Sequence, residues 1–422
     1  MKVTSLPFNS NATSLTEMFQ LQAETSLIID VSKAEELIGD ELTYKSIEVA
    51  SSREPISLFA MSSAIGSCDG FLALPVVAVG REYLTVSYYP PAQNSEIGLV
   101  AVEDGTIVTV SLRRTARPGL QLNWNGSTYT SGDQFTLTLD RHETAQLQDH
   151  SDLTGTRINA SRPVIVLSGN DFIPDGFLTA PSHLVEQLPP IESWGRTFYL
   201  APMGLVGSSS GGSGAGGGYQ IKFISNVDGA RVAVDIGRTA SNVTLADAGN
   251  PTPYDVGTGS KIPLFTSPAA GAYGTIRSDS TLLVAQFARG PNGTNHHRAM
   301  TIVPPVESYK SLYIFSTGSS PYTNLTHFVS IVAEKSAVAR LTFDGRLIFG
   351  SVQSLSSSSS SSASSSSLWT NCSADGVMVG TVLTVDSGVH RLEQLDGRTF
   401  GAIIYGAAEG DCAYAFPVGM CL

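Results

Sequence analysis

The sequence predicts an all-β fold in which β-sandwich-like repeats of about 115 residues follow one another in tandem. Two observations lead to this prediction. Segments rich in Val, Ile, Thr, Tyr and Phe alternate with Gly- and Ser-rich turns, and helical periodicity is nearly absent. A proline-led pattern also recurs at a constant interval. With 422 residues, 42% of them apolar, the chain is long enough to bury a large core.

The repeat is clearest in three segments with the sequences LPVVAVGREYLTVSY, LPPIESWGRTFYLAPM and VPPVESYKSLYIFST. Their matching residues are separated by 115 positions: Pro75, Pro190 and Pro305, followed by Tyr83, Phe198 and Tyr313. An aromatic residue that recurs in register fills the same internal slot in every repeat. Core packing is therefore favoured for these aromatics over a ligand-binding face.

Each repeat continues with a predicted strand pair around a tight turn and ends with an apolar strand. Asp104-Gly105 and Asp228-Gly229 are typical of two-residue hairpin turns, and Lys335-Ser336 takes their place in the third copy. The closing strands are ASRPVIVLSGN, SDSTLLVAQFARG and DGRTFGAIIYGAA. The related SSREPISLFAMS occurs once before the first full copy, which indicates a leading half-repeat.

These patterns predict the following organisation: a flexible N-terminal leader over 1–24, a leading half-repeat over 25–69, and repeats 1, 2 and 3 over 70–182, 183–296 and 297–422. A closed propeller-like arrangement of the repeats is the alternative, although a blade needs only four strands and roughly 45 residues. Helix is expected only near 32–39. The Gly-rich segment 208–218 and the Ser tract 356–367 are expected to be loop insertions.

The net charge of −12 makes nucleic acid and anionic membrane surfaces poor partners, because no block of Lys or Arg offsets it. No stretch approaches the 18 apolar residues that a membrane-spanning helix needs. The first 20 residues also lack the apolar run of a secretory signal. Taken literally, that absence predicts a cytoplasmic protein.

Two features favour an extracellular protein instead. We reconcile them with the missing secretory signal by expecting that the chain lacks its natural N-terminus. Asn-x-Ser/Thr sequons predict glycosylation at Asn11, Asn125, Asn159, Asn242, Asn292, Asn324 and Asn371. The chain also has an even number of cysteines, Cys68, Cys372, Cys412 and Cys421. They predict two disulfides, for which three pairings are possible, and the alternative is four reduced thiols.

Candidate catalytic and cofactor motifs fail on their context, so we expect no catalytic residue, no cofactor and no metal. Gly212, Gly214 and Gly217 match G-x-G-x-x-G, but a predicted strand follows where a helix must hold the pyrophosphate. The segment from Gly66 to Gly70 has the outline of a nucleophile elbow with Cys68 at its centre, but FLALPVV follows it and cannot supply the helix. The histidines and cysteines have no zinc spacing.

Several segments resemble the N-terminal domain of the IgGFc-binding protein family: DGFLALPVVAVGREYLTVSYYP, DLTGTRINASRPVIVLSGN, HLVEQLPPIESWGRTFYLAPM and FGAIIYGAAEGDCAYAFPVGM. The resemblance extends from about Thr25 to the end of the chain. It implies an extracellular protein of mucus, secretions or cell surfaces, in which this module often stands beside von Willebrand type D domains. No motif specifies an antibody contact. The loop 170–182 lacks the cysteines common in the family, so no disulfide pairing is carried over.

We therefore predict a secreted binding, adhesion or mucus-matrix scaffold module that recognises a glycoprotein or matrix component. Two other hypotheses stay open at this point. A carbohydrate-active enzyme on a β scaffold would need a cleft with two carboxylates about 5 to 9 Å apart. A purely structural, self-associating subunit would need an exposed apolar patch or strand edge.

Overall fold

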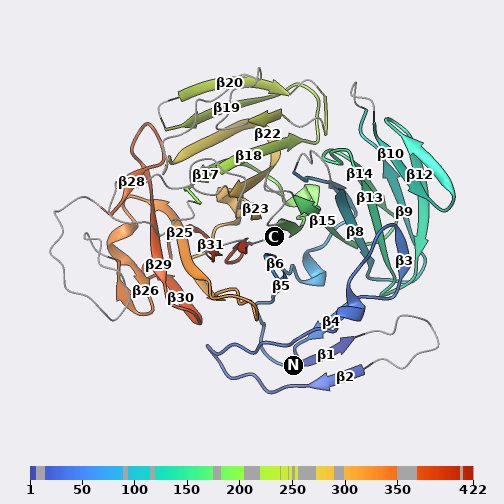
Figure 1. The fold of residues 1–422 in the computed structure, drawn as a ribbon. Helices are drawn as coiled ribbons and strands as arrows, with labels where there is room; N and C mark the ends of the chain where they lie inside the picture. The colour runs from blue at the N-terminus through green and yellow to red at the C-terminus, as the bar shows by residue number, and fades with distance from the viewer. Residues whose placement is uncertain are drawn as a thin grey trace. The chain divides into compact units, whose positions relative to one another are not determined.

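A computed structural model of the 422-residue chain describes residues 1–5, 15–88, 94–114, 119–173, 182–203, 219–237, 239–245, 247–249, 252–254, 272–288, 299–348, 368–408 and 412–421. These residues form antiparallel strands and single 3-10 turns, with no α-helix among them (Figure 1). The all-β prediction is confirmed. No helix in the described part of the chain has the length and apolar character needed to cross a membrane.

The chain divides into two compact units, whose boundaries differ from those of the repeats. Unit 1 comprises 1–58, 73–171 and 185–193, and unit 2 comprises 59–72, 172–184 and 194–422. The last residues of the predicted leading half-repeat and the first of repeat 1, together 59–72, thus belong to the second unit. The repeat boundaries themselves stay a prediction.

Repeat 1 supplies most strands of two antiparallel sheets, in the orders β12-β9-β14-β7 and β16-β15-β8-β13-β3. Strand β3 comes from the leading half-repeat, and β16 comes from the junction with repeat 2. Alternating exposed and buried residues on β12 and β9 give the first of these sheets one apolar face, as expected for a sandwich. The strands are β3 (Glu41–Thr43), β7 (Glu82–Leu84), β8 (Ser95–Ala101), β9 (Thr106–Ser111), β12 (Gln134–Leu139), β13 (Thr144–Asp149), β14 (Arg157–Ala160), β15 (Val164–Ile173) and β16 (Ser182–Gln187). A separate hairpin joins β10 (Gln121–Trp124) to β11 (Ser127–Thr130).

Repeat 3 has the same plan, with sheets β24-β30-β26-β27 and β28-β29-β25-β31-β32. Its core contains Phe315, Phe400 and Phe416, all nearly inaccessible to solvent. The strands are β24 (Leu312–Ser316), β25 (Thr326–Glu334), β26 (Leu341–Phe343), β27 (Arg346–Leu347), β28 (Thr370–Asn371), β29 (Met378–Val385), β30 (Val389–Gln394), β31 (Gly401–Ala407) and β32 (Ala413–Pro417).

Repeat 2 joins the two sheets into one through an unusually long strand. The first half of this strand, β22, pairs with β17 and β19, as β14 pairs with β7 and β9 in repeat 1. The second half of β22 pairs with β18 and β23. The strands are β17 (Gly195–Leu200), β18 (Tyr219–Ser225), β19 (Ala230–Ile236), β20 (Thr239–Leu245), β21 (Thr252–Tyr254), the long β22 (Gly274–Ala288) and β23 (Met300–Ile302). In repeat 1 Pro163 separates β14 from β15, because proline has no N–H to give to a ladder.

The predicted hairpins at the Asp-Gly turns are wrong, although the turns themselves form. Gly105 and Gly229 have φ of +62° and +72°, as expected for such turns. The strands on either side nevertheless pair with other partners. β8 pairs with β13 and β15, whereas β9 pairs with β12 and β14, so the turn carries the chain from one sheet to the other.

Two further expectations near the N-terminus need correction. Residues 1–24 are not simply a leader, because β1 (Lys2–Ser5) pairs with β2 (Leu15–Met18) and with β4 (Ile47–Ala50). The segment expected to be helical forms only the 3-10 turn η1 (Lys33–Glu35), capped by the Ser32 hydroxyl. The chain is already extended at the next residue, which ends the turn.

The recurring proline marks the same local structure in all three repeats. Each proline carbonyl accepts a hydrogen bond from the backbone N–H three residues later, in the turns η2 (Val76–Ala78), η3 (Ile191–Ser193) and η5 (Val306–Ser308). A strand with a buried aromatic residue follows each turn: Tyr83, Phe198 and Tyr313 are at most 3% exposed. These three aromatics lie in the core.

Candidate functional site

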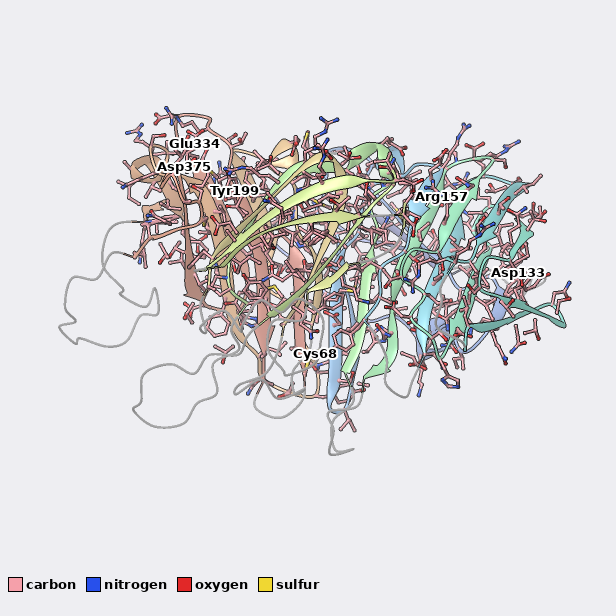
Figure 2. The ribbon with its side chains drawn as sticks, turned by 90° about the horizontal axis from the view of Figure 1, so that it is seen from above. Cys68, Asp133, Arg157, Tyr199, Glu334 and Asp375 are labelled. Carbon is pink, nitrogen blue, oxygen red and sulfur yellow. A yellow bond between two sulfur atoms is a disulfide. The ribbon has the colours of Figure 1, made fainter. Side chains whose placement is uncertain are left out.

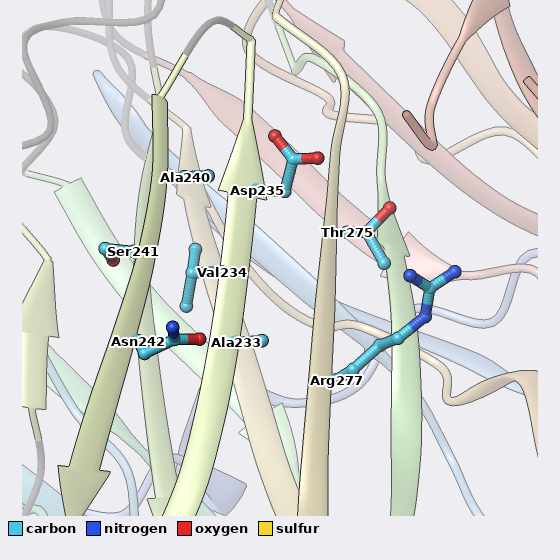
Figure 3. Close-up of a pocket in the computed structure, with 8 residues that line it drawn as sticks. All are labelled: Ala233, Val234, Asp235, Ala240, Ser241, Asn242, Thr275 and Arg277. Carbon is cyan, nitrogen blue, oxygen red and sulfur yellow. The ribbon is translucent and has the colours of Figure 1, made fainter. Parts of the chain in front are cut away.

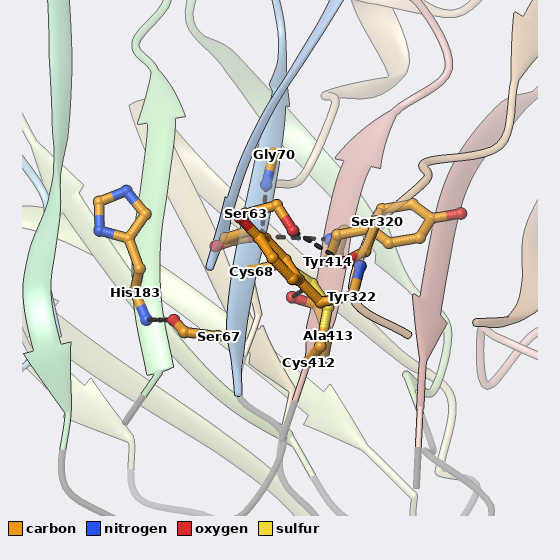
Figure 4. The surroundings of a disulfide bond; sticks show 12 residues. Ser63, Ser67, Cys68, Gly70, His183, Ser320, Tyr322, Cys412, Ala413 and Tyr414 are labelled. Atoms are coloured by element: carbon orange, nitrogen blue, oxygen red, sulfur yellow. Dashed lines mark hydrogen bonds between the residues drawn. A yellow bond between two sulfur atoms is a disulfide. The ribbon is translucent and has the colours of Figure 1, made fainter. Parts of the chain in front are cut away.

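A disulfide anchors the hairpin at the boundary between the leading half-repeat and repeat 1. Cys68 lies on β6 (Ser67–Leu72), which pairs with β5 (Phe59–Ala64). It is bonded to Cys412, the residue just before β32 and 344 positions later (Figure 4). Both cysteines are buried in unit 2, and Figure 2 labels Cys68 among the strands. The nucleophile-elbow outline around Cys68 is thus part of a strand, with its sulfur held in a disulfide.

The next residue, Asp69, strengthens the same anchor. Its side chain is fully buried, and its carboxylate accepts backbone N–H bonds from Gly70 at 2.9 Å, Met300 at 3.1 Å and Ala415 at 3.4 Å. Because β23 and β32 supply the last two donors, Asp69 connects three strands of unit 2. A buried carboxylate is costly without such partners, so this residue is structural. The sequence showed it only as part of the elbow outline.

The other two cysteines do not form the second expected bridge. Cys372 is buried in a cluster with Tyr309 and Met378, and burial raises the pKa of its thiol to about 12. Cys421 is an exposed free thiol near the chain end. The expectation of a second disulfide is corrected on this point, because Cys372 packs among apolar side chains while Cys421 faces solvent.

Most of the sequons within the described residues lie at the surface. Asn125, Asn242, Asn324 and Asn371 are exposed, and Asn159 is half-buried on β14. Asn11 and Asn292 lie outside the described residues, as do the glycines of the G-x-G-x-x-G match and the Ser tract. Glycosylation at all seven positions stays a prediction.

Among the histidines that the structure describes, the one whose pKa shifts furthest lies in the core. The two ring nitrogens of His327 bond the Tyr414 hydroxyl at 2.9 Å and the Ser387 hydroxyl at 3.0 Å. Burial, with a smaller contribution from His390, lowers the pKa of His327 to about 4, so the ring is neutral at physiological pH. Nowhere in the part of the chain that the structure describes do three His, Cys, Asp or Glu side chains meet as metal ligands.

A shallow hollow on the outer face of repeat 2 brings polar side chains together (Figure 3). Two cross-strand rows build it: Ala240, Asp235 and Thr275 in one, and Asn242, Ala233 and Arg277 in the other. Strand β19 alternates strictly, with Val232, Val234 and Ile236 buried and the residues between them turned outward. Alanines therefore form the floor, and longer polar side chains form the walls.

The walls of this hollow carry both signs of charge. The exposed Arg277 guanidinium donates to the Tyr199 hydroxyl at 3.3 Å. Asp235 lies on the neighbouring strand, two residue pairs further along on the same face. The Thr275 hydroxyl is occupied, since it donates to the Cys372 carbonyl at 2.8 Å. The hollow offers hydrogen-bond donors and acceptors over about 290 Å³ of free space, and it holds no paired carboxylates.

The fold and the disulfide define the class of protein: an all-β module of sandwich-like repeats in which a disulfide joins the hairpin β5–β6 to the residue before β32. The chain belongs to the IgGFc-binding protein family, because the family model described as IgGFc binding protein matches residues 69–406. The human IgGFc-binding protein is 26% identical over 350 residues. That match covers 82% of this chain but only 6% of the human protein.

The resemblance found in the sequence is therefore confirmed at the level of the family. The sequence also pointed to Cys68 as a disulfide cysteine. It did not reveal the hollow, because Asn242, Ala233 and Arg277 are brought together by strand pairing across up to 44 residues. The one feature of the sequence that could have indicated the hollow is the presence of alanines at outward-facing strand positions close to a sequon.

Proposed function

We propose that this chain is an extracellular binding or adhesion module, or a scaffold of a mucus-type matrix, that recognises a glycoprotein or matrix component without catalysing a reaction. Membership of the IgGFc-binding protein family carries the proposal. The chain spans 6% of its human relative, so that protein's partners serve here only as candidates.

Two structural observations support an extracellular setting. Disulfides form and persist in oxidising compartments, and the Cys68–Cys412 bond joins two buried positions. Four sequons lie exposed within the described residues, where a glycan has room. Both features fit a module that folds in the secretory pathway.

The chemistry of the surface supports a protein or glycoprotein partner. The net charge of −12 disfavours nucleic acid and anionic membranes. The name of the human relative states that it binds IgG Fc, which makes the Fc fragment the first candidate partner. Secreted and matrix glycoproteins as a wider group form the second.

A binding experiment on the secreted chain tests this proposal. The chain is immobilised and challenged with IgG Fc, enzymatically deglycosylated Fc, a purified mucin and a glycan array. We expect saturable binding to at least one of these ligands, which heat-denatured chain does not show. Absence of binding to all of them, or release of a cleaved product from any of them, would overturn the proposal.

A further inference from the structure

The hollow of repeat 2 contains two residues that are unusual for the outer face of a sheet. Ala233 and Ala240 are both exposed and both point outward from neighbouring strands. Alanine is depleted in strands, where larger or β-branched side chains cover the pleated surface better. On this face the short alanine side chains leave room between the longer side chains around them.

A glycosylation sequon lies at the edge of this hollow. Asn242 faces Ala233 directly across β19 and β20, and the Thr244 of its Asn-Val-Thr sequon lies two residues along the same face. Among the strands that the structure describes, β20 lies at the end of its sheet and pairs only with β19. Figure 3 shows the Asn242 amide next to Ala233, with Arg277 beyond it.

We propose that Asn242 carries an N-linked glycan whose first N-acetylglucosamine lies in this hollow, over the two alanines. Attachment joins the Asn242 amide nitrogen to C1 of the sugar, while the bond from C1 to the diphosphate of a polyprenyl-linked oligosaccharide donor breaks. The amide loses one proton, and the polyprenyl diphosphate leaves. The inference rests on the extracellular setting of the proposed function.

The geometry suits a sugar in size and chemistry. Arg277 is two strand spacings, about 10 Å, from Asn242, so a ring attached to the asparagine extends toward it across Ala233. The guanidinium supplies donors and the Asp235 carboxylate supplies acceptors, which match the acetamido and hydroxyl groups of the sugar. The apolar Ala233 methyl group suits the flat face of the ring.

The other exposed sequons within the described residues provide the contrast. Asn125 lies in the tight turn between β10 and β11 with φ of +48°, and a side chain added at its neighbour Gly126 would meet nothing within 4 Å. A glycan on Asn125 projects into open solvent. This sequon is therefore the matched control for a glycan that has a surface to lie on.

The test measures how fast each glycan is released from the folded protein. The chain is produced in a eukaryotic secretory host, treated with peptide-N-glycosidase under native conditions, and followed by glycopeptide mass spectrometry. We expect Asn242 to be occupied and its glycan to be released about tenfold more slowly than that of Asn125, as a contact of modest affinity would give. After denaturation both rates should be equal.

Two variants on one face of β19 sharpen the test. Ala233→Gln fills the hollow without touching the core, and should make release at Asn242 as fast as at Asn125. Arg231→Gln, two residues away on the same face, should leave the protection in place. An unoccupied Asn242, equal release from both sequons, or unchanged protection in Ala233→Gln would overturn the inference. Loss of occupancy at every sequon would also overturn the extracellular setting, whereas failure at Asn242 alone would not.

Discussion

Two tyrosines at equivalent positions form the same hydrogen-bond relay in repeats 1 and 3. The Tyr83 hydroxyl accepts from the Gly80 N–H at 2.7 Å and donates to the Val164 carbonyl at 2.8 Å. Tyr313 does the same between Lys310 and Phe400, at 2.9 and 2.7 Å. In repeat 2 the residue is Phe198, which has no hydroxyl.

Gly195 occupies the equivalent backbone position in repeat 2 and pairs with Leu282, as Lys310 pairs with Phe400 in repeat 3. The backbone pairing is common to both copies, and the tyrosine hydroxyl is an additional link that Phe198 does not make.

We expect Tyr83→Phe to lower the free energy of unfolding by about 1–3 kcal/mol, since it leaves the buried Gly80 N–H without its acceptor. Tyr313→Phe should cost less, because Lys310 is exposed and water can reach its backbone. Urea titration of both variants provides the measurement, with the exposed Tyr322→Phe as control. Equal losses in all three variants would refute the relay.

Because Glu96 is buried, we expect the stability of unit 1 to depend on pH. Burial raises its pKa to about 7, against the hydrogen bond from Gln148, and Asp171 and Glu36 add to the rise. The folded state thus favours the protonated acid. Its contribution to stability is complete below pH 4.5 and is lost as the pH rises through 7.

The substitution Glu96→Gln keeps this group neutral at every pH. It should leave stability near pH 4.5 almost unchanged and raise it by about 1–3 kcal/mol at pH 8. Thermal unfolding of both proteins across that range is the measurement. A gain that is the same at both ends of the range would show that ionisation of Glu96 is not the cause.

At the scale of elements, the second and third proline turns pack against the start of the aromatic strand in the preceding repeat. A Cβ added at Gly80 would lie 2.6 Å from Pro190 Cβ and 2.2 Å from the Glu192 carboxylate. Repeat 2 shows the same notch, where a Cβ at Gly195 would lie 2.3 Å from Pro305 Cβ. These glycines are needed for close approach.

Gly195→Ala is therefore expected to overpack this junction and to lower the free energy of unfolding by about 1–3 kcal/mol. The equivalent position in repeat 3 is Lys310, which already bears a side chain and is exposed. Lys310→Ala is the matched control and should change stability by less than about 0.5 kcal/mol. Chemical denaturation compares them, and a Gly195→Ala protein as stable as the control would contradict the packing argument.

At the scale of the molecule, the disulfide constrains nearly the whole chain. Cys68 and Cys412 close a loop of 344 residues, and restricting so long a loop in the unfolded state favours folding. Within unit 2 the bond holds β6 beside β32, where Asp69 adds its backbone contacts. The disulfide and the Asp69 hydrogen bonds together hold the hairpin β5–β6 against β32.

Replacing both bonded cysteines by serine should lower the free energy of unfolding by about 2–5 kcal/mol. Proteolysis should then begin within 59–72. Cys421→Ser, at an exposed free thiol, should have no such effect. Thiol titration of the denatured, unreduced protein should count two free thiols, and a count of four or none would contradict the assigned pairing.

The sequence by itself determined the fold class, the proline register, the buried aromatics and the family, because each depends on local residue types that recur in order along the chain. Only the tertiary structure decided which strands share a sheet. The Asp-Gly turns have hairpin chemistry, yet β8 and β9 enter different sheets because each finds its own distant partners. Cys68 meets Cys412, and Asn242 meets Ala233 and Arg277, for the same reason: strand pairing is set by non-local burial that no short segment encodes.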